Sequence, residues 1–408
     1  MAGVLGETFN PFAEDPYPFY ARARQEQPIA FSSELNAWLI TGYKEIQQIL
    51  LQPEKFSSCD TLTSPATFYP RTLEELIKGY LPVPIVLNTD GAEHTRLRLP
   101  LTKAFAPARI RAIEPFIRDV AHSLVDAFID DRRTEIISQF AYPLALEVVL
   151  TLLGIPRHDI AQTRQWSHDW LMLMSVQLEE AQQVACARST VAFQHYLAGM
   201  IAERRERPQN DLISALLHAN VPGQEPLTET ELVITLQGLI LAGHESTTNM
   251  IGTGLLLLLE QPERWKRLCK HPEYIPTTVE EILRFDAPIQ MFVRTTTQEV
   301  TISGVTLPED ASLLLLYGSG NRDEVFFPQA QEFQMQRASN HHLAFGHGVH
   351  FCVGAALARL EGKIAFEVLC ERLPQLSLIP EQMLTHIPTL LFRGYERLEV
   401  AWVEHEEG

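Results

Sequence analysis

Residues 345–354 read Phe-Gly-His-Gly-Val-His-Phe-Cys-Val-Gly, and an apolar run with helical spacing follows at residues 355–361. Cys352 therefore stands where a helix begins, and there the unpaired N–H groups and the positive end of the helix dipole favour a thiolate over a thiol. Gly346, Gly348 and Gly354 permit unusual backbone angles and the close approach of a flat, bulky ligand. The stretch thus predicts a metal-binding thiolate that faces such a ligand.

Two other interpretations of Cys352 stay open from the residues alone. A free cysteine is more often a small buried hydrophobic side chain than a ligand, which predicts a core position. Zinc is the second alternative, with His347, His350 and Cys352 as ligands, although this spacing lacks the paired CxxC or HxxxH ligands typical of zinc sites.

A second unusual stretch interrupts a long apolar helix that we predict over residues 227–260. The helix opens with a capping-box pattern at residues 228–231, and apolar residues surround its axis, which predicts a buried helix. Its middle, residues 242–249, nevertheless reads Ala-Gly-His-Glu-Ser-Thr-Thr-Asn. Burying a carboxylate and hydroxyls costs on the order of several kcal/mol without partners, so a functional cause is favoured over a solvated helix face or a kink. Ala242 and Gly243 leave room for a ligand beside the backbone, and Glu245 with Ser246 can pass protons.

The chain resembles the cytochrome P450 family at both stretches. Residues 345–354 match the family's haem-binding signature, FGxGxHxCxG, at every specified position, and residues 242–247 resemble its oxygen-activating motif, [AG]Gx[DE]T[TS]. The resemblance implies a bacterial-type soluble haem-thiolate monooxygenase of secondary metabolism. It also implies a mainly α fold with minor β, formed by a single domain over residues 1–408, in which haem lies between the long central helix and the helix after the Cys352 loop.

The resemblance assigns expected roles to the residues of both motifs. Cys352 is implied to be the metal ligand of haem b (iron protoporphyrin IX), where its electron donation assists O–O cleavage of the co-substrate O2. Glu245, Ser246 and Thr247 are implied to manage the protons. Ser246 occupies the usual Thr position, and serine lacks the methyl group that restricts the threonine rotamer, so we expect a less firmly held hydrogen bond to dioxygen. The other expected haem contacts are Ala242, Gly243, Phe345, Gly346, His350 and Gly354.

Further matches concern the haem propionates and the support of the haem-binding side. A buried haem needs cationic or hydrogen-bonding partners for its two propionates, and the positions that match the family's partners are His94, Arg98, Arg294 and His350. Glu281 and Arg284 are one helical turn apart and can pair. The resemblance makes them the family's ExxR pair with Arg337 as third member, in a role of structural support.

Composition limits the classes of partner. The 408-residue chain is 46% hydrophobic, so it can bury a large core, and its formal net charge of −18 argues against nucleic acid and anionic membranes. Neither a signal peptide nor a membrane-spanning run is present, which predicts a cytoplasmic protein. The odd number of cysteines favours reduced thiols over disulfides.

Apolar periodicity predicts helices over residues 43–51, 108–130, 141–153, 179–207, 227–260 and 354–373. Strands are expected at residues 37–40 and within 293–316, with a hairpin at 300–305. The Pro- and Thr-rich residues 57–93 are expected to form an irregular binding loop or a disordered insertion.

The implied reaction inserts one oxygen atom of O2 into a hydrophobic small molecule, by hydroxylation or epoxidation. Candidate pocket residues are Leu239, Ile240, Ile289, Met291, Phe292, Val293 and Leu391, besides residues 57–93 and 166–174; Arg71 and Lys78 are candidates for binding an acidic substrate group. All of these side chains could instead belong to the core or to the surface.

Electrons are expected from a separate ferredoxin and ferredoxin reductase, or a flavodoxin. The expected docking patch consists of Lys103, Arg109, Arg111, Arg359 and Lys363. Alternatives to an oxygenase are a haem-based sensor or carrier, a haem-free helical protein, and a related enzyme that uses peroxide or isomerises its substrate.

Overall fold

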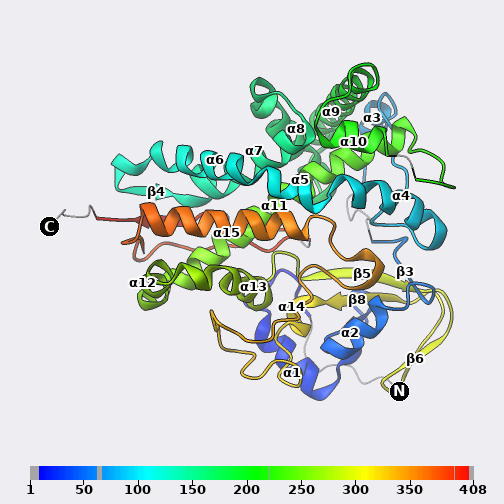
Figure 1. Ribbon diagram of the computed structural model, residues 1–408. Helices are drawn as coiled ribbons and strands as arrows, with labels where there is room; N and C mark the ends of the chain where they lie inside the picture. The colour runs from blue at the N-terminus through cyan, green and yellow to red at the C-terminus, as the bar shows by residue number, and fades with distance from the viewer. Residues whose placement is uncertain (1–8, 62–66, 220, 390, 404–408) are drawn as a thin grey trace. The chain divides into compact units, whose positions relative to one another are not determined.

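The computed structural model describes residues 9–61, 67–219, 221–389 and 391–403 (Figure 1). Its internal contacts divide the chain into two compact units. We call Met1–Ser57, Glu114–Ala145 and Glu245–Gly408 the sheet unit, and Ser58–Ile113 with Leu146–His244 the helix unit. Among the described residues, all strands belong to the sheet unit.

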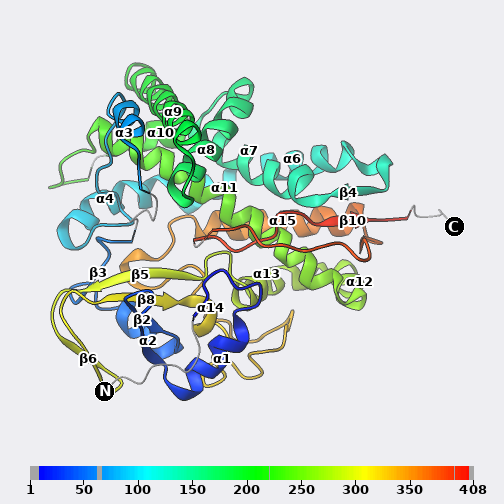
Figure 2. The ribbon, with the colours of Figure 1, turned by 180° about the vertical axis from the view of Figure 1, so that it is seen from behind.

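The main sheet of the sheet unit has the strand order β1-β2-β8-β5-β3. Only the β2–β8 pair is parallel, with Trp38 opposite Leu313. In Figure 2 the helices α1, α2 and α14 lie near this sheet. Its strands are β1 (Ile29–Ser32), β2 (Ala37–Ile40), β3 (Phe56–Ser57), β5 (Met291–Thr296) and β8 (Ser312–Leu316).

Two smaller sheets complete this unit. One contains β4 (Arg133–Glu135), β10 (Glu399–Ala401) and β9 (Ser377–Leu378). The other is the hairpin of β6 (Val300–Ile302) and β7 (Val305–Leu307), which confirms the hairpin predicted from the sequence. Its turn residues Ser303 and Gly304 have φ of 47° and 80°, the left-handed conformations that a tight hairpin turn requires.

In the sheet unit, α15 packs against α6, α12 and α13. Trp265 on α12 is buried there, and its indole Nε1 donates to the Leu373 carbonyl at 3.2 Å. The helices are α1 (Tyr17–Glu26), α2 (Tyr43–Leu50), α6 (Glu114–Asp126), α12 (Pro262–Lys270), α13 (Ile275–Phe285), α14 (Tyr317–Gly320) and α15 (Ala355–Arg372).

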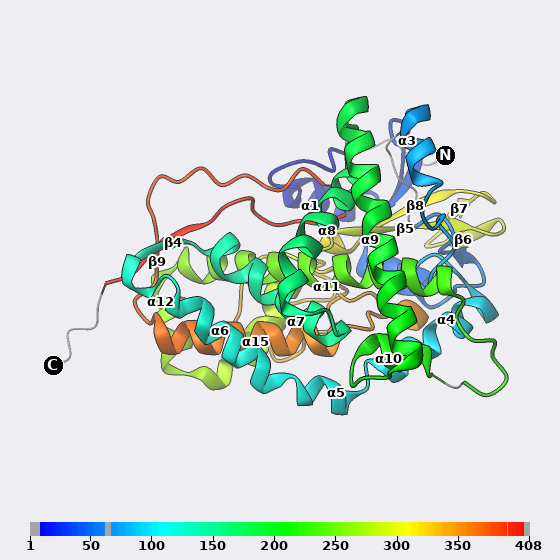
Figure 3. The same cartoon turned by 90° about the horizontal axis from the view of Figure 1, so that it is seen from above.

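The helix unit is built around α9, against which α3, α8 and α10 pack (Figure 3). Its helices are α3 (Pro70–Leu76), α4 (Gly91–Ala104), α5 (Pro107–Ala112), α8 (Ile160–Ser175), α9 (Glu180–Glu206) and α10 (Leu212–Leu217). Two further helices, α7 (Tyr142–Leu153) and α11 (Glu229–Leu259), contain residues of both units. The division falls inside α11, between His244 and Glu245.

The long central helix was predicted correctly, with its capping box. Thr228 Oγ1 accepts the Glu231 N–H at 3.3 Å, and the Glu231 carboxylate accepts the Thr228 N–H at 2.7 Å. The single helix predicted over residues 108–130 is wrong, because α5 ends at Ala112 and α6 begins at Glu114. Pro115 has no N–H to donate to a carbonyl four residues earlier, so the helical hydrogen bonding of α5 cannot continue through it, which explains the break.

The segment predicted as irregular contains the short helix α3, which begins with Pro70. Residues 62–66 of that prediction lie outside the described part of the chain. Two buried glutamines of α9 hold the segment by its backbone. Gln194 accepts the Tyr80 N–H at 2.9 Å and donates to the Tyr80 carbonyl at 3.1 Å, while Gln183 accepts from Tyr69 N at 2.9 Å and donates to the Thr67 carbonyl at 3.0 Å. We call these two contacts the glutamine clamps.

Candidate functional site

The Cys352 loop connects a short 3-10 turn, Gly348–His350, to helix α15. The Cys352 thiol forms no disulfide and is exposed, which is unlike the core position of the first alternative. The backbone N–H of Cys352 donates to the Phe345 carbonyl at 2.8 Å, so the loop closes on itself. Gly354 is the N-cap residue of α15, and Cys352 therefore lies next to the first turn, where the helix dipole favours a thiolate.

The glycines of the loop differ in what they do. Gly346 and Gly348 have φ of 69° and 71°, as expected for positions that need left-handed backbone. A Cβ on Gly348 would also lie 2.5 Å from the Leu50 carbonyl oxygen, at the end of α2. The expectation of an unusual backbone angle at Gly354 is wrong, since its φ is −86°.

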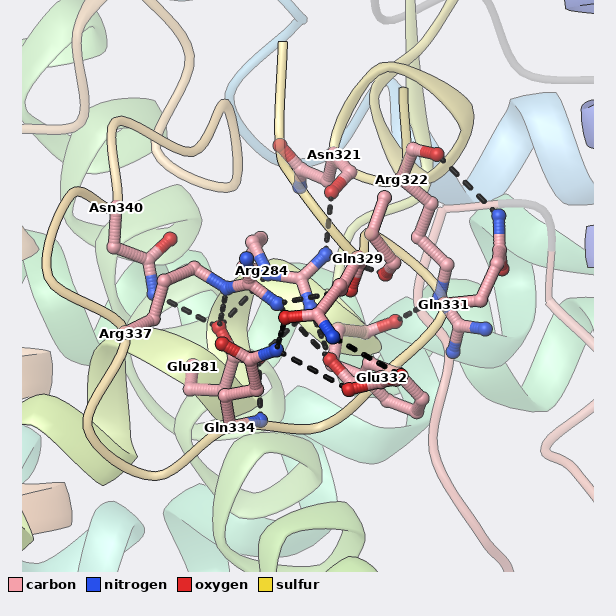
Figure 4. A network of polar contacts seen from close by, with 12 residues as sticks. Glu281, Arg284, Asn321, Arg322, Gln329, Gln331, Glu332, Gln334, Arg337 and Asn340 are labelled. Atoms are coloured by element: carbon pink, nitrogen blue, oxygen red, sulfur yellow. Dashed lines mark hydrogen bonds and ion pairs between the residues drawn. The ribbon is translucent and has the colours of Figure 1, made fainter. Parts of the chain in front are cut away.

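A buried ion-pair network supports this side of the unit (Figure 4). The guanidinium of Arg284 pairs with both carboxylate oxygens of Glu281 at 2.8 Å, and Arg337 Nε reaches the same carboxylate at 2.9 Å. Arg284 also donates to the carbonyls of Asn321, Ala330 and Glu332. The pairing predicted from the spacing is thus present, and the network cross-links α13 to the residues that precede the Cys352 loop.

Asn321 extends this support to the loop. Its carbonyl accepts from Arg284, and its side-chain Oδ1 accepts the Leu343 N–H at 2.6 Å. Since Leu343 O in turn accepts the Gly346 N–H at 2.8 Å, hydrogen bonds connect the ion-pair network with the start of the signature. The Asn321-Arg322-Asp323 turn is part of the resemblance to the family, but no role was predicted for Asn321, because such a turn is also common in surface loops.

The polar middle of α11 has a graded exposure. Thr247 is 3% exposed, Glu245 and Ser246 are partly exposed, and Ala242 is exposed. The acid and the alcohol of the motif are thus less buried than Thr247. A Cβ on Gly243 would lie 2.6 Å from Val149 Cγ2 of α7. A residue without a side chain is therefore needed here for α7 and α11 to pack closely.

The residues predicted to bind the propionates lie in both units. Arg294 is 4% exposed on β5, and His350 ends the 3-10 turn of the Cys352 loop. His94 is buried and Arg98 partly buried, one helical turn apart on α4.

Tyr317 lies beside the Cys352 loop and was not predicted from the sequence. A Cβ on Gly346 would lie 3.9 Å from the Tyr317 hydroxyl, and burial raises the pKa of that hydroxyl.

These residues fit a haem better than a zinc ion. Within the described ranges, no group of three or more His, Cys, Asp or Glu side chains is arranged to hold a metal ion, so the zinc alternative with His347 and His350 is wrong. A haem needs one protein ligand on its proximal side, and the exposed Cys352 thiol at a helix start has that chemistry. Among the predicted partners of the propionates, Arg98 and Arg294 are permanent cations.

Several predicted pocket residues have core contacts. Met291 belongs to a hydrophobic cluster with Phe9 and Tyr20, and Phe292 packs against a second cluster. Ile240 is fully buried. Leu239, Ile289, Val293 and Leu391 are partly buried. Their role in substrate binding stays a prediction.

The cations of the predicted docking patch have different surroundings. Arg359 pairs with Glu280 at 2.7 Å, Lys363 lies 3.5 Å from Glu367, and Arg109 donates to the Asp211 carbonyl at 2.7 Å. Lys103 and Arg111 are exposed. Arg359 and Lys363 are thus already paired with carboxylates of this chain.

Comparison with known proteins identifies the family. The sequence profile described as Cytochrome P450 matches residues 40–388. The chain belongs to the cytochrome P450 family. It is 38% identical to the mycinamicin IV hydroxylase/epoxidase of Micromonospora griseorubida, over 90% of each chain. It is 34% identical to the biotin biosynthesis cytochrome P450 of Bacillus subtilis, over 96% of this chain and 97% of the relative.

Solved cytochrome P450 structures have the same fold. The cytochrome P450 CREJ in complex with (4-ethylphenyl) dihydrogen phosphate superimposes with a TM-score of 0.90 at 31% identity, over 97% of this chain and 99% of the other. The P450 heme domain of Tepidiphilus thermophilus has a TM-score of 0.92 at 30% identity, over 98% and 97%. The mainly α fold with minor β is confirmed, and this cytochrome P450 is a haem-thiolate monooxygenase that uses O2 and needs electron-transfer partners. In the part of the chain that the structure describes, no helix has the length and apolarity to cross a bilayer.

Proposed function

We propose that the Cys352 thiolate would hold the haem b iron of this monooxygenase, and that the enzyme hydroxylates or epoxidises an apolar small molecule with electrons from a separate ferredoxin system or flavodoxin. The exposed Cys352 thiol at the start of α15 is the observation that carries the proposal. The balanced reaction takes substrate, O2, two electrons and two protons to oxygenated product and water. When bound, haem supplies the activation of O2 and the transfer of one oxygen atom.

The protein's own residues manage protons. Glu245 is partly exposed on α11, so its carboxylate can exchange protons with water and pass them inward. Ser246 is the next residue and carries a hydroxyl that both donates and accepts. Thr247, 3% exposed, is proposed to position the two from the buried side of the helix. Serine lacks the methyl group that restricts the threonine rotamer, so we expect more loss of reducing equivalents than a threonine would allow.

The cofactor's propionates are proposed to pair with Arg294, His94 and Arg98. Guanidinium groups bind carboxylates through paired N–H donors, and His94 adds a hydrogen-bond donor. His350, on the Cys352 loop, completes the set. Phe345, Gly346, Gly354, Ala242 and Gly243 are proposed as the other residues that would contact the haem.

The substrate class is proposed from the relatives. Several are named for large apolar molecules, such as the 6-deoxyerythronolide B hydroxylase and the vitamin D(3) 25-hydroxylase, and one solved neighbour carries an acyl carrier protein with a bound hexadecenoic acid. We propose a polyketide, steroid or fatty acyl substrate. Leu239, Ile289, Val293 and Leu391 are the proposed walls, and the exposed Arg71 is a better partner for a carboxylate than Lys78, which pairs with Glu75.

The reductase is proposed to be a separate protein. Some solved neighbours are self-sufficient enzymes of about twice the length, of which this chain covers 52%. The exposed Lys103 and Arg111 are proposed to attract an acidic ferredoxin. The five cysteines, all of them among the described residues, form no disulfide, as is typical of a reducing compartment, and this supports a cytoplasmic location.

The test is the carbon monoxide difference spectrum of the dithionite-reduced protein, compared between the natural chain, Cys352→Ser and Cys59→Ser. Cys59 is a second exposed thiol and serves as the matched control. The proposal expects a Soret band at the thiolate position in the natural chain and in Cys59→Ser, and its loss in Cys352→Ser. A thiolate band that survives in Cys352→Ser would refute the ligand assignment. Polyketides, steroids and fatty acids are then ranked by the shift of the ferric iron from low to high spin.

A further inference from the structure

Three polar side chains from distant parts of the sequence meet behind the Cys352 loop. Glu280 lies on α13, His342 precedes the signature, and Arg359 lies on α15. The carboxylate of Glu280 accepts two hydrogen bonds from Arg359, at 2.7 and 2.9 Å, and one from His342 Nε2 at 3.2 Å. We call these residues the Glu280 cluster. It is distinct from the neighbouring Glu281 network, with which it shares no hydrogen-bonded residue.

The hydrogen bonds of His342 fix its tautomer. Its Nδ1 accepts the backbone N–H of Ala344 at 3.2 Å, so Nδ1 carries no proton, and Nε2–H donates to Glu280. The imidazole is 2% exposed, and burial lowers its pKa. A neutral His342 therefore connects α13 directly with the backbone of the residue before Phe345.

Arg359 makes a second connection to the loop. Its guanidinium carbon lies 4.5 Å from the centroid of the Phe345 ring, a cation–π contact. The His342 ring is 5.7 Å from the same ring. Two members of the cluster thus contact Phe345, whose side chain is 9% exposed.

Phe345 transmits this restraint to the thiol residue. Its carbonyl accepts the backbone N–H of Cys352 at 2.8 Å, and its ring contacts Phe351, at 6.1 Å between centroids. A displaced Phe345 would release the Cys352 N–H, and a free N–H beside a sulfur changes the sulfur's electron density. The chain of contacts runs from Glu280 through Arg359 to Phe345 and then to Cys352.

We propose that Glu280, His342 and Arg359 are positioning residues that hold Phe345 in place and so fix the hydrogen bonding and orientation of Cys352. This inference rests on the proposed role of Cys352 as haem ligand. It also gives Arg359 a task different from docking a redox protein. The cluster is electrically balanced, with one carboxylate and one guanidinium, so it restrains the loop without adding net charge near the sulfur.

The experiment replaces Arg359 by Met and compares it with Lys363→Met. Lys363 lies one turn further along α15, is similarly exposed and loses the same charge. Hydrogen exchange of the Cys352 amide is measured in both variants and in the natural chain. Loss of a cation–π contact is expected to speed exchange roughly 3- to 30-fold in Arg359→Met and to leave it unchanged in Lys363→Met.

Two haem-dependent readouts distinguish positioning from simple stability. The reduction potential is expected to shift in Arg359→Met. In the carbon monoxide difference spectrum of the reduced protein, part of the Soret intensity is expected to appear at the wavelength of a complex with a neutral thiol ligand. Arg359→Lys, which keeps the charge but not the planar fork, should give an intermediate result. If Arg359→Met and Lys363→Met are the same in exchange, potential and band position, the inference is wrong.

A folding failure is tested separately with Glu280→Gln and with the pair Glu280→Gln/Arg359→Met. Coupled residues predict an effect of the pair smaller than the sum of the single effects, whereas additive effects would overturn the inference. The Cys352→Ser spectrum tests only whether Cys352 is the haem ligand. A failure of the positioning role can therefore be distinguished from a failure of the ligand assignment.

Discussion

Replacing Gly79 by alanine tests how firmly the glutamine clamp at Tyr80 holds its segment to α9. A Cβ on Gly79 would overlap Gln194 Oε1 and lie 3.0 Å from Val191 Cγ2, so the amide of Gln194 has to move. That movement breaks both of its hydrogen bonds to the Tyr80 backbone. Each such bond contributes about 1 kcal/mol net, and loss of about 2 kcal/mol corresponds to roughly 30-fold more frequent opening.

The assay is native-state hydrogen exchange at the Tyr80 amide, which is itself the donor to Gln194. Gly199→Ala is the control, because Gly199 lies on α9 like Gln194, and a Cβ added at Gly199 would have no atom within 4 Å. It is expected to leave exchange at Tyr80 unchanged. Gln194→Ala should reproduce the effect of Gly79→Ala without any overlap. A Tyr80 exchange rate in Gly79→Ala within twofold of the natural chain would refute the reasoning.

Three further predictions concern the sheet unit. Arg284→Met breaks a fully buried ion pair and is expected to lower the free energy of unfolding by about 3–5 kcal/mol, measured in urea, whereas exposed Arg71→Met should change it little. Gly348→Ala should lower the thermal midpoint more than Gly304→Ala: both positions have positive φ, but only the first would place a Cβ 2.5 Å from a carbonyl oxygen. Equal midpoints would contradict the overlap. The paired Glu280 has a pKa of about 2 against an ordinary 4.5, so its stabilisation is present above pH 4.5 and is lost as the pH falls toward 2. Glu280→Gln should flatten the fall of the urea midpoint over this range, and exposed Glu299→Gln should not.

Local chemistry made the central parts of the fold predictable. The capping box at Thr228 defines the start of α11, and the apolar run after Gly354 defines α15. The Cys352 loop was found because its glycines and its thiol lie within ten consecutive residues. The prediction failed where two local signals disagreed. Around Pro115 it followed the apolar spacing, which favours one continuous helix, although the proline breaks the helix in the structure.

Contacts between distant segments could not be predicted in this way. The glutamine clamps join side chains of α9 to backbone more than a hundred residues earlier, and glutamine has no pattern that predicts such a partner. Arg359 was expected on an exposed basic patch, yet Glu280 lies opposite it. Gly243 was expected to make room for a ligand, and Val149 occupies the space on its Cβ side. In each case the tertiary neighbour determines the role of the residue.

The division of α11 between His244 and Glu245 has a consequence for protein engineering. Glu245, Ser246 and Thr247 belong to the same unit as the Cys352 loop, whereas Leu239, Ile240 and Arg71 belong to the other. A chimera that takes residues 146–244 from a relative would keep the acid, the alcohol and the thiol of this chain. Under the roles proposed above, oxygen chemistry and part of the substrate preference belong to separate stretches, and recombination is expected to vary one while the other stays constant.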